Sequence, residues 1–394
     1  MTNSFFLKGF TRNIIIVGVV SLFTDLSSQM VFPLIPLYLV TIGASAWVVG
    51  LVEGAAESTA SLLKVFSGYR SDKIRKRKPF VFVGYSLSAL TKPLFALANI
   101  WPFVLIIRIT ERIGKGIRTA PRDAIIAESA GESVRGKVYG YHRAMDGIGS
   151  ISGAVLAFIL LPILGFKNIF LLAFIPGAIA IFFIYFIKEK KVFEKNNKMN
   201  LKISFKKFPT NLKLFITISA IFSFGHFGYA FLLLRARNIG LCNDTAIFLY
   251  VLFYIVYTLF IIPAGAISDK IGRKPVIFFG YFIFGLTTLG LIFTYQMTAL
   301  IIIFLIYGIF FAMIDGVQRA FVVDLSPPEL KATALGAFHT AIGLVALPGG
   351  LIAGIIWDKI SPNATFIFGL ILTLLSLILL TFIKNNKKIQ KIDN

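Results

Sequence analysis

Charged side chains stand inside long apolar stretches in the first half of this 394-residue chain. An ionisable side chain at the centre of a lipid bilayer costs about 2.5 kcal/mol or more, so residues in such a setting are candidates for function. The second half holds His226, Asp315, Arg319 and His339 in this setting. The first half holds five acids and five bases: Asp25, Glu53, Glu57, Lys64, Lys92, Arg108, Glu111, Arg112, Arg143 and Asp146.

The spacing of these residues predicts charged stripes on two helices. Side chains three, four or eleven positions apart lie on one face of an α-helix. Acids on one helix can then neutralise bases on its neighbour. The two sets are Glu53, Glu57 and Lys64 at i, i+4 and i+11, and Arg108, Glu111 and Arg112 at i, i+3 and i+4.

Two chemistries fit this pattern. In the first, a carboxylate binds and releases a proton, because apolar surroundings favour its neutral form and a nearby arginine favours its charged form. In the second, the charges form permanent ion pairs that hold a bundle of helices together. We expect some member of the cluster to be functional, since ten charges exceed what packing needs. The residues expected to serve coupling or substrate contact are Asp25, Glu53, Glu57, Arg108 and Arg112, with Glu111, Arg143, Asp146 and His226 as further candidates.

Other reactive side chains are few. His226 stands in a small aromatic segment, where it either faces a cavity or packs as a hydrogen-bonded side chain. His142 and His339 complete no metal-ligand spacing, and Cys242, as the single cysteine, excludes an internal disulfide and a multi-cysteine metal site. The sequence contains no phosphate-loop, zinc-protease or serine-hydrolase signature. It therefore predicts no enzyme, no cofactor and no metal centre.

The elements that position these residues are expected to be membrane-spanning helices. Hydrophobic residues make up 57% of the chain and charged residues 15%, against about 45–50% and about 25% in soluble domains. A helix needs about 20 apolar residues to cross the hydrocarbon. We therefore predict an all-α polytopic membrane protein with 12 transmembrane helices. The runs are about 13–39, 46–69, 80–98, 101–119, 137–163, 168–187, 212–234, 245–266, 276–295, 298–323, 334–357 and 363–383.

The basic residues predict an orientation. The net charge is +22, but lysine and arginine gather in alternate loops and in both tails. This is the positive-inside pattern, and it places both termini in the cytoplasm, with the chain in the cytoplasmic membrane. Attraction to anionic lipid explains the excess, so we expect the bilayer and no nucleic acid as a partner. The oligomeric state is open, and a monomer is compatible with the sequence.

A repeated string indicates that the chain is a duplication. The segment 265–275 reads GAISDKIGRKP, and 68–79 reads GYRSDKIRKRKP, which places Gly68 and Gly265, and also Asp72 and Asp269, 197 residues apart. Segments 124–140 and 320–336 match at a shift of 196. Self-similarity at a fixed period identifies repeated structural units. We predict six-helix bundles at 1–187 and 212–394, joined by a cytoplasmic linker at 188–211.

These features resemble the major facilitator superfamily of secondary transporters over essentially the whole chain. Its loop signature, G-x-x-x-D-x-x-G-R-[KR], is complete in the second copy, whereas Arg75 replaces the second glycine in the first. The resemblance implies that this loop holds the halves together when the cytoplasmic side is closed. Asp72 and Asp269 would make the gate contacts, with Arg273 and Lys274 as partners. The gate residues are Gly68, Asp72, Gly265, Asp269, Gly272 and Arg273.

Two further family signatures are incomplete. The helix-four signature Arg-x-x-Gln-Gly is met only at Arg108, and the antiporter signature has Ala154 in place of proline. The resemblance implies a secondary active transporter that moves a small molecule or ion by alternating access, coupled to protons, with efflux slightly favoured over uptake. An uncoupled facilitator and a non-transporting receptor of the same fold stay as alternatives.

Overall fold

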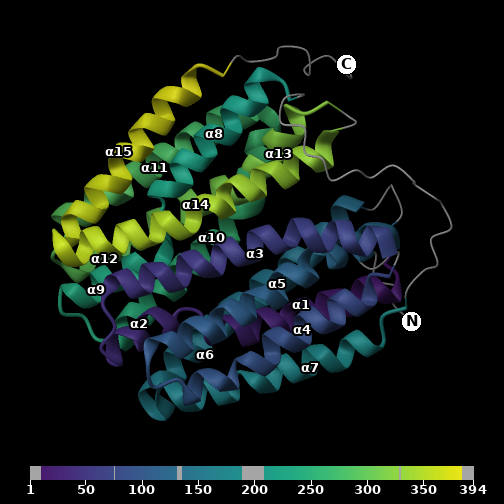
Figure 1. Cartoon of the computed structure of the whole chain (residues 1–394), viewed down its shortest axis with the longest axis horizontal. Coiled ribbons are helices and arrows are strands. Elements are labelled where there is room, and N and C mark those ends of the chain that lie inside the picture. The colour runs from purple at the N-terminus through teal and green to yellow at the C-terminus, as the bar shows by residue number, and fades with distance from the viewer. Residues whose placement is uncertain (1–9, 75, 131–134, 189–207, 328–329, 384–394) are drawn as a thin grey trace.

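The computed structural model describes residues 10–74, 76–130, 135–188, 208–327 and 330–383. Every regular element within these residues is helical. Figure 1 shows two bundles side by side, with the first described residues, at the purple end of the colour scale, and the last described residues, at the yellow end, towards the same end of the bundles. We call this end the termini face and the other end the opposite face. Most of the predicted linker, including residues 189–207, lies outside the described residues, as does Arg75.

The first bundle contains the helices of the first half. They are α1 (Arg12–Gln29), α2 (Leu34–Thr41), α3 (Ala46–Ile74), α4 (Lys78–Thr91), η1 (Pro93–Leu97), α5 (Trp101–Ser129), α6 (Arg135–Leu172) and α7 (Phe174–Tyr185). The second bundle contains α8 (Thr210–Gly225), α9 (Gly228–Asn238), α10 (Asn243–Ile271), α11 (Arg273–Phe293), α12 (Met297–Asp315), α13 (Val317–Asp324), α14 (Lys331–Lys359) and α15 (Pro362–Thr381).

The helices account for the twelve expected spans. Within the described residues, nine helical stretches are long and apolar enough to cross a membrane. One of them, Lys137–Tyr185, holds two spans, because Gly165 breaks the helix with a φ of +67°. Helices α3 and α5 complete the set. Each has 29 residues, but their many charged residues make them less apolar than the other nine stretches.

Several predicted spans are interrupted or longer than expected. The run 13–39 is two helices, because the chain turns at Met30–Phe32 before Pro33. The run 212–234 breaks at His226 and Phe227, and the run 298–323 breaks at Gly316. Helix α5 continues through Pro121 to Ser129, ten residues past the predicted end. A count of apolar residues does not detect such breaks, since the interrupted segments stay apolar.

The two bundles repeat the same local contacts. Helices α3 and α10 both have 29 residues and begin 197 positions apart. Lys78 donates a hydrogen bond to the carbonyl of Tyr185, and Lys274 donates one to the carbonyl of Thr381, with both partners shifted by 196. These paired contacts join the first turn of α4 to α7 and that of α11 to α15. The duplication seen in the sequence therefore extends to tertiary contacts.

Backbone contacts between α3 and α14 form the longest seam between the bundles. A Cβ atom on Gly50 would lie 2.0 Å from the Gly350 carbonyl oxygen, and one on Gly354 would lie 2.4 Å from the Trp47 Cα. Nearer the termini face, Ser58 donates to the Gly343 carbonyl at 2.5 Å. We call these contacts the glycine seam. Small residues allow such close approach of helix backbones in a membrane.

A second contact between the bundles joins α6 to α10. A Cβ atom on Gly147 would lie 2.5 Å from the Thr258 methyl group, and the rings of Phe158 and Phe248 lie 5.6 Å apart. The glycines of α6 also pack within the first bundle, since Gly149 and Gly153 each face a carbonyl of α1. These glycines permit close helix packing.

Candidate functional site

A cavity of about 350 Å³ lies between the two bundles. Small-molecule sites have volumes of about 300–1,000 Å³. Its wall comes from α3 and α5 of the first bundle and from α8, α9, α12, α13 and α14 of the second. The ionisable side chains in the wall are Glu53, Glu57, Lys64, Arg112, His226, Tyr229, Tyr307, Asp315, Arg319 and His339.

A closed ion-pair network lies at one edge of this cavity. Arg108 is fully buried, and its Nη2 atom donates to the Glu53 carboxylate at 3.0 Å. Its Nη1 atom donates to Glu111 at 3.3 Å, and its guanidinium lies 4.2 Å above the Phe32 ring. The predicted neutralisation of acids by bases on neighbouring helices is confirmed for this set. Arg108 and Glu111 do not line the cavity, whereas Glu53 does.

Glu57 and Arg112 stand one helical turn farther along α3 and α5. Glu57 lines the cavity, its side chain is exposed there, and it accepts a hydrogen bond from Ser61 at 3.1 Å. Arg112 is only 6% exposed, and its Nη1 atom is buried with no hydrogen-bond partner. The nearest carboxylate to its Nε atom is that of Glu111, at 3.6 Å. No ion pair joins Glu57 to Arg112 in the described part of the chain.

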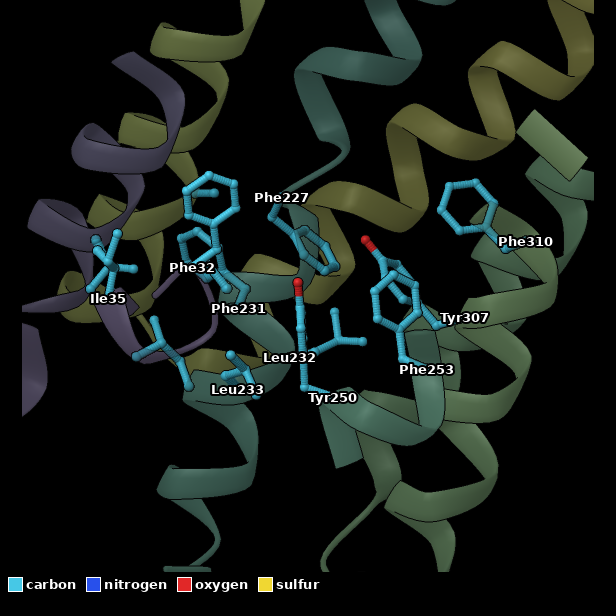
Figure 2. Packing of buried hydrophobic residues seen from close by; sticks show 14 of the residues in the cluster. Phe32, Ile35, Phe227, Phe231, Leu232, Leu233, Tyr250, Phe253, Tyr307 and Phe310 are labelled. Carbon is cyan, nitrogen blue, oxygen red and sulfur yellow. The ribbon is translucent and has the colours of Figure 1, made fainter. Parts of the chain in front are cut away.

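The second bundle supplies an aromatic wall. Its rings include Phe222, Phe227, Phe231, Phe310 and Tyr307. Figure 2 shows several of these rings gathered near Tyr250 and Phe253, with Phe32 of the first bundle beside them. The break between α8 and α9 brings His226 to this wall. Its Nε2 atom lies 3.1 Å from the Tyr307 hydroxyl, so His226 both faces the cavity and is hydrogen-bonded.

Charged residues of both bundles meet in the part of the cavity nearer the termini face. Asp315 pairs with Arg319 at 2.9 Å and accepts a hydrogen bond from Tyr257 at 3.0 Å. Arg143 of α6 lies 3.7 Å from Asp315, which joins the first bundle to the second. Lys64 also lines this part. Glu53, Glu57 and Lys64 therefore share one face of α3, as their spacing predicts.

Two of the predicted acids lie away from the cavity. Asp146 accepts a hydrogen bond from Ser21 and lies 3.3 Å from His142 and 4.0 Å from Arg143. Asp25 on α1 makes no ion pair within the described residues, and its nearby charges are Asp146 and the basic residues of α5. The structure thus divides the predicted cluster into cavity residues and a separate set between α1, α5 and α6.

The predicted gate residues pair within their own bundles. Arg77 lies 3.1 Å from Asp72 and 2.9 Å from Glu128. Arg273 contacts Asp269 and lies 3.2 Å from Asp324. The segment is helical rather than a loop up to Ile74 and Ile271.

The three gate glycines differ in backbone geometry. Gly272, with a φ of +96°, makes the turn between α10 and α11. Gly68 is helical and packs closely against Ala120, and Gly265 is helical with open space beside it. Helices α3 and α10 continue past Gly68 and Gly265, so neither of these glycines makes a turn. Lys274, expected beside the acids, instead donates to the Thr381 and Ile383 carbonyls.

Sequence reasoning missed a polar contact between the bundles. Gln29 of α1 donates to the Tyr254 hydroxyl at 2.5 Å and accepts from Tyr250 at 2.8 Å. The duplication points to these two tyrosines, because a shift of 197 aligns Tyr250 and Tyr254 with Glu53 and Glu57. The chain thus carries carboxylates on one copy of this helix and phenols on the other.

A further buried basic side chain lies beyond the cavity. Arg118 lies within α5 and is 5% exposed. Its guanidinium stacks on Tyr85 at 4.4 Å and donates to the Ser88 hydroxyl at 2.5 Å. Across the described residues, no group of three or more His, Cys, Asp or Glu side chains is arranged to hold a metal ion.

Comparison with known proteins identifies the family. The model of the Major Facilitator Superfamily matches residues 17–235 and 214–393. An uncharacterized MFS-type transporter of Methanocaldococcus jannaschii is 43% identical over 381 residues, which cover 95% of each chain. The solved structures of the nucleoside transporter NupG, in a mutant form, and of a D-xylose-proton symporter share this fold. The NupG structure has a TM-score of 0.79 at 15% identity, and the match covers 95% of this chain and 100% of that one. The symporter has a TM-score of 0.76 at 17% identity, and the match covers 95% of this chain and 98% of that one. The chain belongs to the major facilitator superfamily, with its two bundles of six transmembrane helices.

Proposed function

We propose that this protein is a proton-coupled secondary transporter that moves a small solute across the cytoplasmic membrane by alternating access. Residues 1–187 and 212–394 would move as two bodies joined by 188–211, with both termini in the cytoplasm. The observation that carries the proposal is the charged cavity between the bundles, whose wall comes from both of them. Binding sites at the interface between repeats are typical of transporters built in this way.

Glu57 is the best candidate for the proton-binding group. It is exposed to the cavity, and Ser61 is its only hydrogen-bond partner in the described residues. Glu53 is held by Arg108 at 3.0 Å in a closed ion-pair network. A carboxylate that is accessible and not paired can exchange a proton with the cavity, whereas a paired one in a closed network serves structure.

Asp25 and Asp146 form a second candidate pathway for protons. They lie near each other beside the basic residues of α5, away from the cavity. Arg143 contacts both Asp146 and, across the bundles, Asp315. A rearrangement of the bundles would therefore change the surroundings of Asp146. Arg108 and Glu111 would fix the first-bundle wall, and Arg112 and His226 would contact the solute.

The gate role of the repeated segment is part of the same proposal. Asp72 and Asp269 pair inside their own bundles, which fits a conformation in which this segment does not join the halves. We retain efflux as the favoured direction. The symporter among the structural relatives supports proton coupling by analogy of fold. A facilitator, with all the charges structural, and a receptor without transport are the alternatives.

Reconstituted protein tests the proposal. Proteoliposomes that contain a pH-sensitive dye are challenged with pools of small solutes, and solute-dependent proton movement is measured in wild type and in Glu57→Gln. We expect proton movement in wild type with at least one pool and none in the variant. A solute that stabilises the purified protein at 100 times its Kd should add about 2.7 kcal/mol to the free energy of unfolding. Stabilisation without any flux would support the receptor, and flux without proton movement the facilitator.

A further inference from the structure

Helices α3 and α5 form a ladder of two residue pairs, Glu53 with Arg108 and Glu57 with Arg112. We call the first pair the closed rung, because an ion pair joins it, and the second pair the open rung. The helices run in the same direction, because Glu53 meets Arg108 and Ser67 meets Gly116 farther along both. Glu53 and Arg108 are 55 residues apart, and so are Glu57 and Arg112. The first pair is closed at 3.0 Å. The second is equivalent in position, but no ion pair of 4.0 Å or less joins it in the described residues.

Both residues of the open rung line the cavity and keep hydrogen-bonding capacity that no described residue satisfies. Arg112 is 6% exposed and lines the cavity, and its Nη1 atom has no partner. A buried donor without a partner costs about 1–3 kcal/mol, so its presence needs an explanation. Glu57 is open to the same space. A ligand with an acceptor and a donor would satisfy both groups.

We propose that the open rung binds a small zwitterion, with a carboxylate on Arg112 and an ammonium group on Glu57. The inference deepens the proposed transport function and rests on it for its physiological meaning. Arginine binds carboxylates through two parallel N–H donors, and charge-assisted hydrogen bonds are about twice as strong as neutral ones. A bridging ligand would close the second rung in the way that the direct pair closes the first.

The charge balance of the cavity favours a ligand without net charge. Three carboxylates line it in the described residues, namely Glu53, Glu57 and Asp315, and three bases line it, namely Lys64, Arg112 and Arg319. A monovalent anion or cation would leave one of these groups uncompensated in a medium of low dielectric constant, which is costly. A zwitterion compensates one acid and one base at once.

The rest of the ligand is expected to be apolar or aromatic. The wall that the second bundle contributes includes Phe222, Phe310 and Tyr307, with His226 hydrogen-bonded to Tyr307. Aromatic rings gain additional stabilisation by stacking on or edge-packing against other rings. A volume of about 350 Å³ accommodates a small molecule of amino-acid size with its side chain.

Three probes that share a 2-phenylethyl group test the proposal by calorimetric titration of the purified full-length protein. They are L-phenylalanine as the zwitterion, 3-phenylpropanoate as the anion and 2-phenylethylamine as the cation, with L-leucine as a second zwitterion. We expect L-phenylalanine to bind wild type at least about tenfold more tightly than either singly charged analogue, since each lost charge-assisted contact is worth a factor of ten or more. Equal affinity for the three, or no binding of either zwitterion, would overturn the proposal.

Variants assign each end of the ligand. Glu57→Gln should weaken the binding of L-phenylalanine about tenfold and leave the binding of 3-phenylpropanoate little changed. Arg112→Gln should also weaken the binding of L-phenylalanine about tenfold, and should leave the binding of 2-phenylethylamine little changed. Glu57→Asp should retain most of the preference, which excludes a folding defect. Asp244→Asn, in the first turn of α10 and outside the cavity wall, is the matched control. If Glu57→Gln weakens all three probes equally, the assignment is wrong.

Flux separates the failure of this inference from the failure of the transport proposal. The expected binding pattern without flux in proteoliposomes would support the zwitterion site and contradict transport. Flux of another solute, with no binding of either zwitterion, would support transport and overturn the zwitterion site.

Discussion

The Nη2 atom of Arg108 lies 3.0 Å from the Glu53 carboxylate, and this ion pair joins α5 to α3 inside the first bundle. The Arg108 side chain is fully buried, and its guanidinium also contacts Glu111 and the face of Phe32. Removal of one partner from a buried ion pair leaves an uncompensated charge and costs about 3–5 kcal/mol.

We therefore expect Glu53→Gln to lower the thermal stability of the purified protein strongly. The matched variant Glu57→Gln should be close to wild type, because the Glu57 side chain makes no ion pair in the described residues and is exposed to the cavity. Unfolding monitored by intrinsic fluorescence measures both. Equal melting temperatures for the two variants would show that the Glu53–Arg108 pair does not stabilise the bundle.

Proton coupling is expected to depend on the carboxylate of Glu57 in particular, and not on carboxylates in general. Glu57→Gln should abolish solute-driven proton movement and leave downhill solute exchange in place at solute concentrations high enough to offset its weaker binding, because the amide cannot titrate while the cavity keeps its shape. Asp25→Asn tests the second pathway in the same assay. Normal proton movement at all pH values in both variants would contradict the coupling assignment.

The glycine seam predicts a sharp difference between two glycine substitutions. A Cβ on Gly50 would lie 2.0 Å from the Gly350 carbonyl oxygen, whereas a Cβ on Gly140 in α6 meets nothing within 4 Å. We expect Gly50→Ala to separate α3 from α14 and to reduce transport at least about tenfold, since overpacking costs roughly 1–3 kcal/mol. Gly140→Ala, the control, should transport normally, because the added methyl group meets no neighbour and alanine is the better helix former. Equal activities would show that the seam tolerates separation.

Asp358 is expected to stabilise closure at the opposite face. Its carboxylate accepts hydrogen bonds from the backbone amides of Ala46 and Trp47, at 3.1 and 2.8 Å, so α14 caps the first turn of α3 in the other bundle. Loss of a helix cap costs about 1 kcal/mol, which corresponds to a factor of about five in an equilibrium. Asp358→Ala should therefore shift the population toward conformations that are open at this face.

Cysteine labelling measures that shift. Ser223 lines the cavity, so Ser223→Cys in a Cys242→Ala background reports access from the opposite face through a membrane-impermeant maleimide. We expect the labelling rate to rise about fivefold with Asp358→Ala and to stay unchanged with Lys359→Ala. An unchanged rate with Asp358→Ala would indicate that the cap does not contribute to closure.

The sequence predicts the architecture well, because duplication and hydropathy act along the chain. The shift of 197 between Asp72 and Asp269 anticipates the matched lengths of α3 and α10. The helical spacing of Glu53, Glu57 and Lys64 anticipates their common face on the cavity. These features depend on local periodicity and on repetition, and both can be read without knowing which helices touch.

The features that the sequence did not predict depend on tertiary contacts. The break that presents His226 lies in a segment that is apolar throughout, so hydropathy does not mark it. The hydrogen bonds of Gln29 to Tyr250 and Tyr254 join residues more than 200 positions apart. Which rung of the ladder is closed depends on side-chain geometry, since Glu53 and Glu57 have the same type and setting.

Hydrogen bonds at the termini face, from Lys78 to Tyr185 in one bundle and from Lys274 to Thr381 in the other, join each bundle to itself. In the glycine seam, backbone faces backbone at Gly50 and Gly350, and the side-chain hydrogen bonds that join α3 to α14 lie on either side, at Ser58 and at Asp358. We therefore expect the mechanical compliance of the molecule to be concentrated along α3 and α14. The bundles would then move relative to each other as two rigid bodies, and this motion would take place along these two helices.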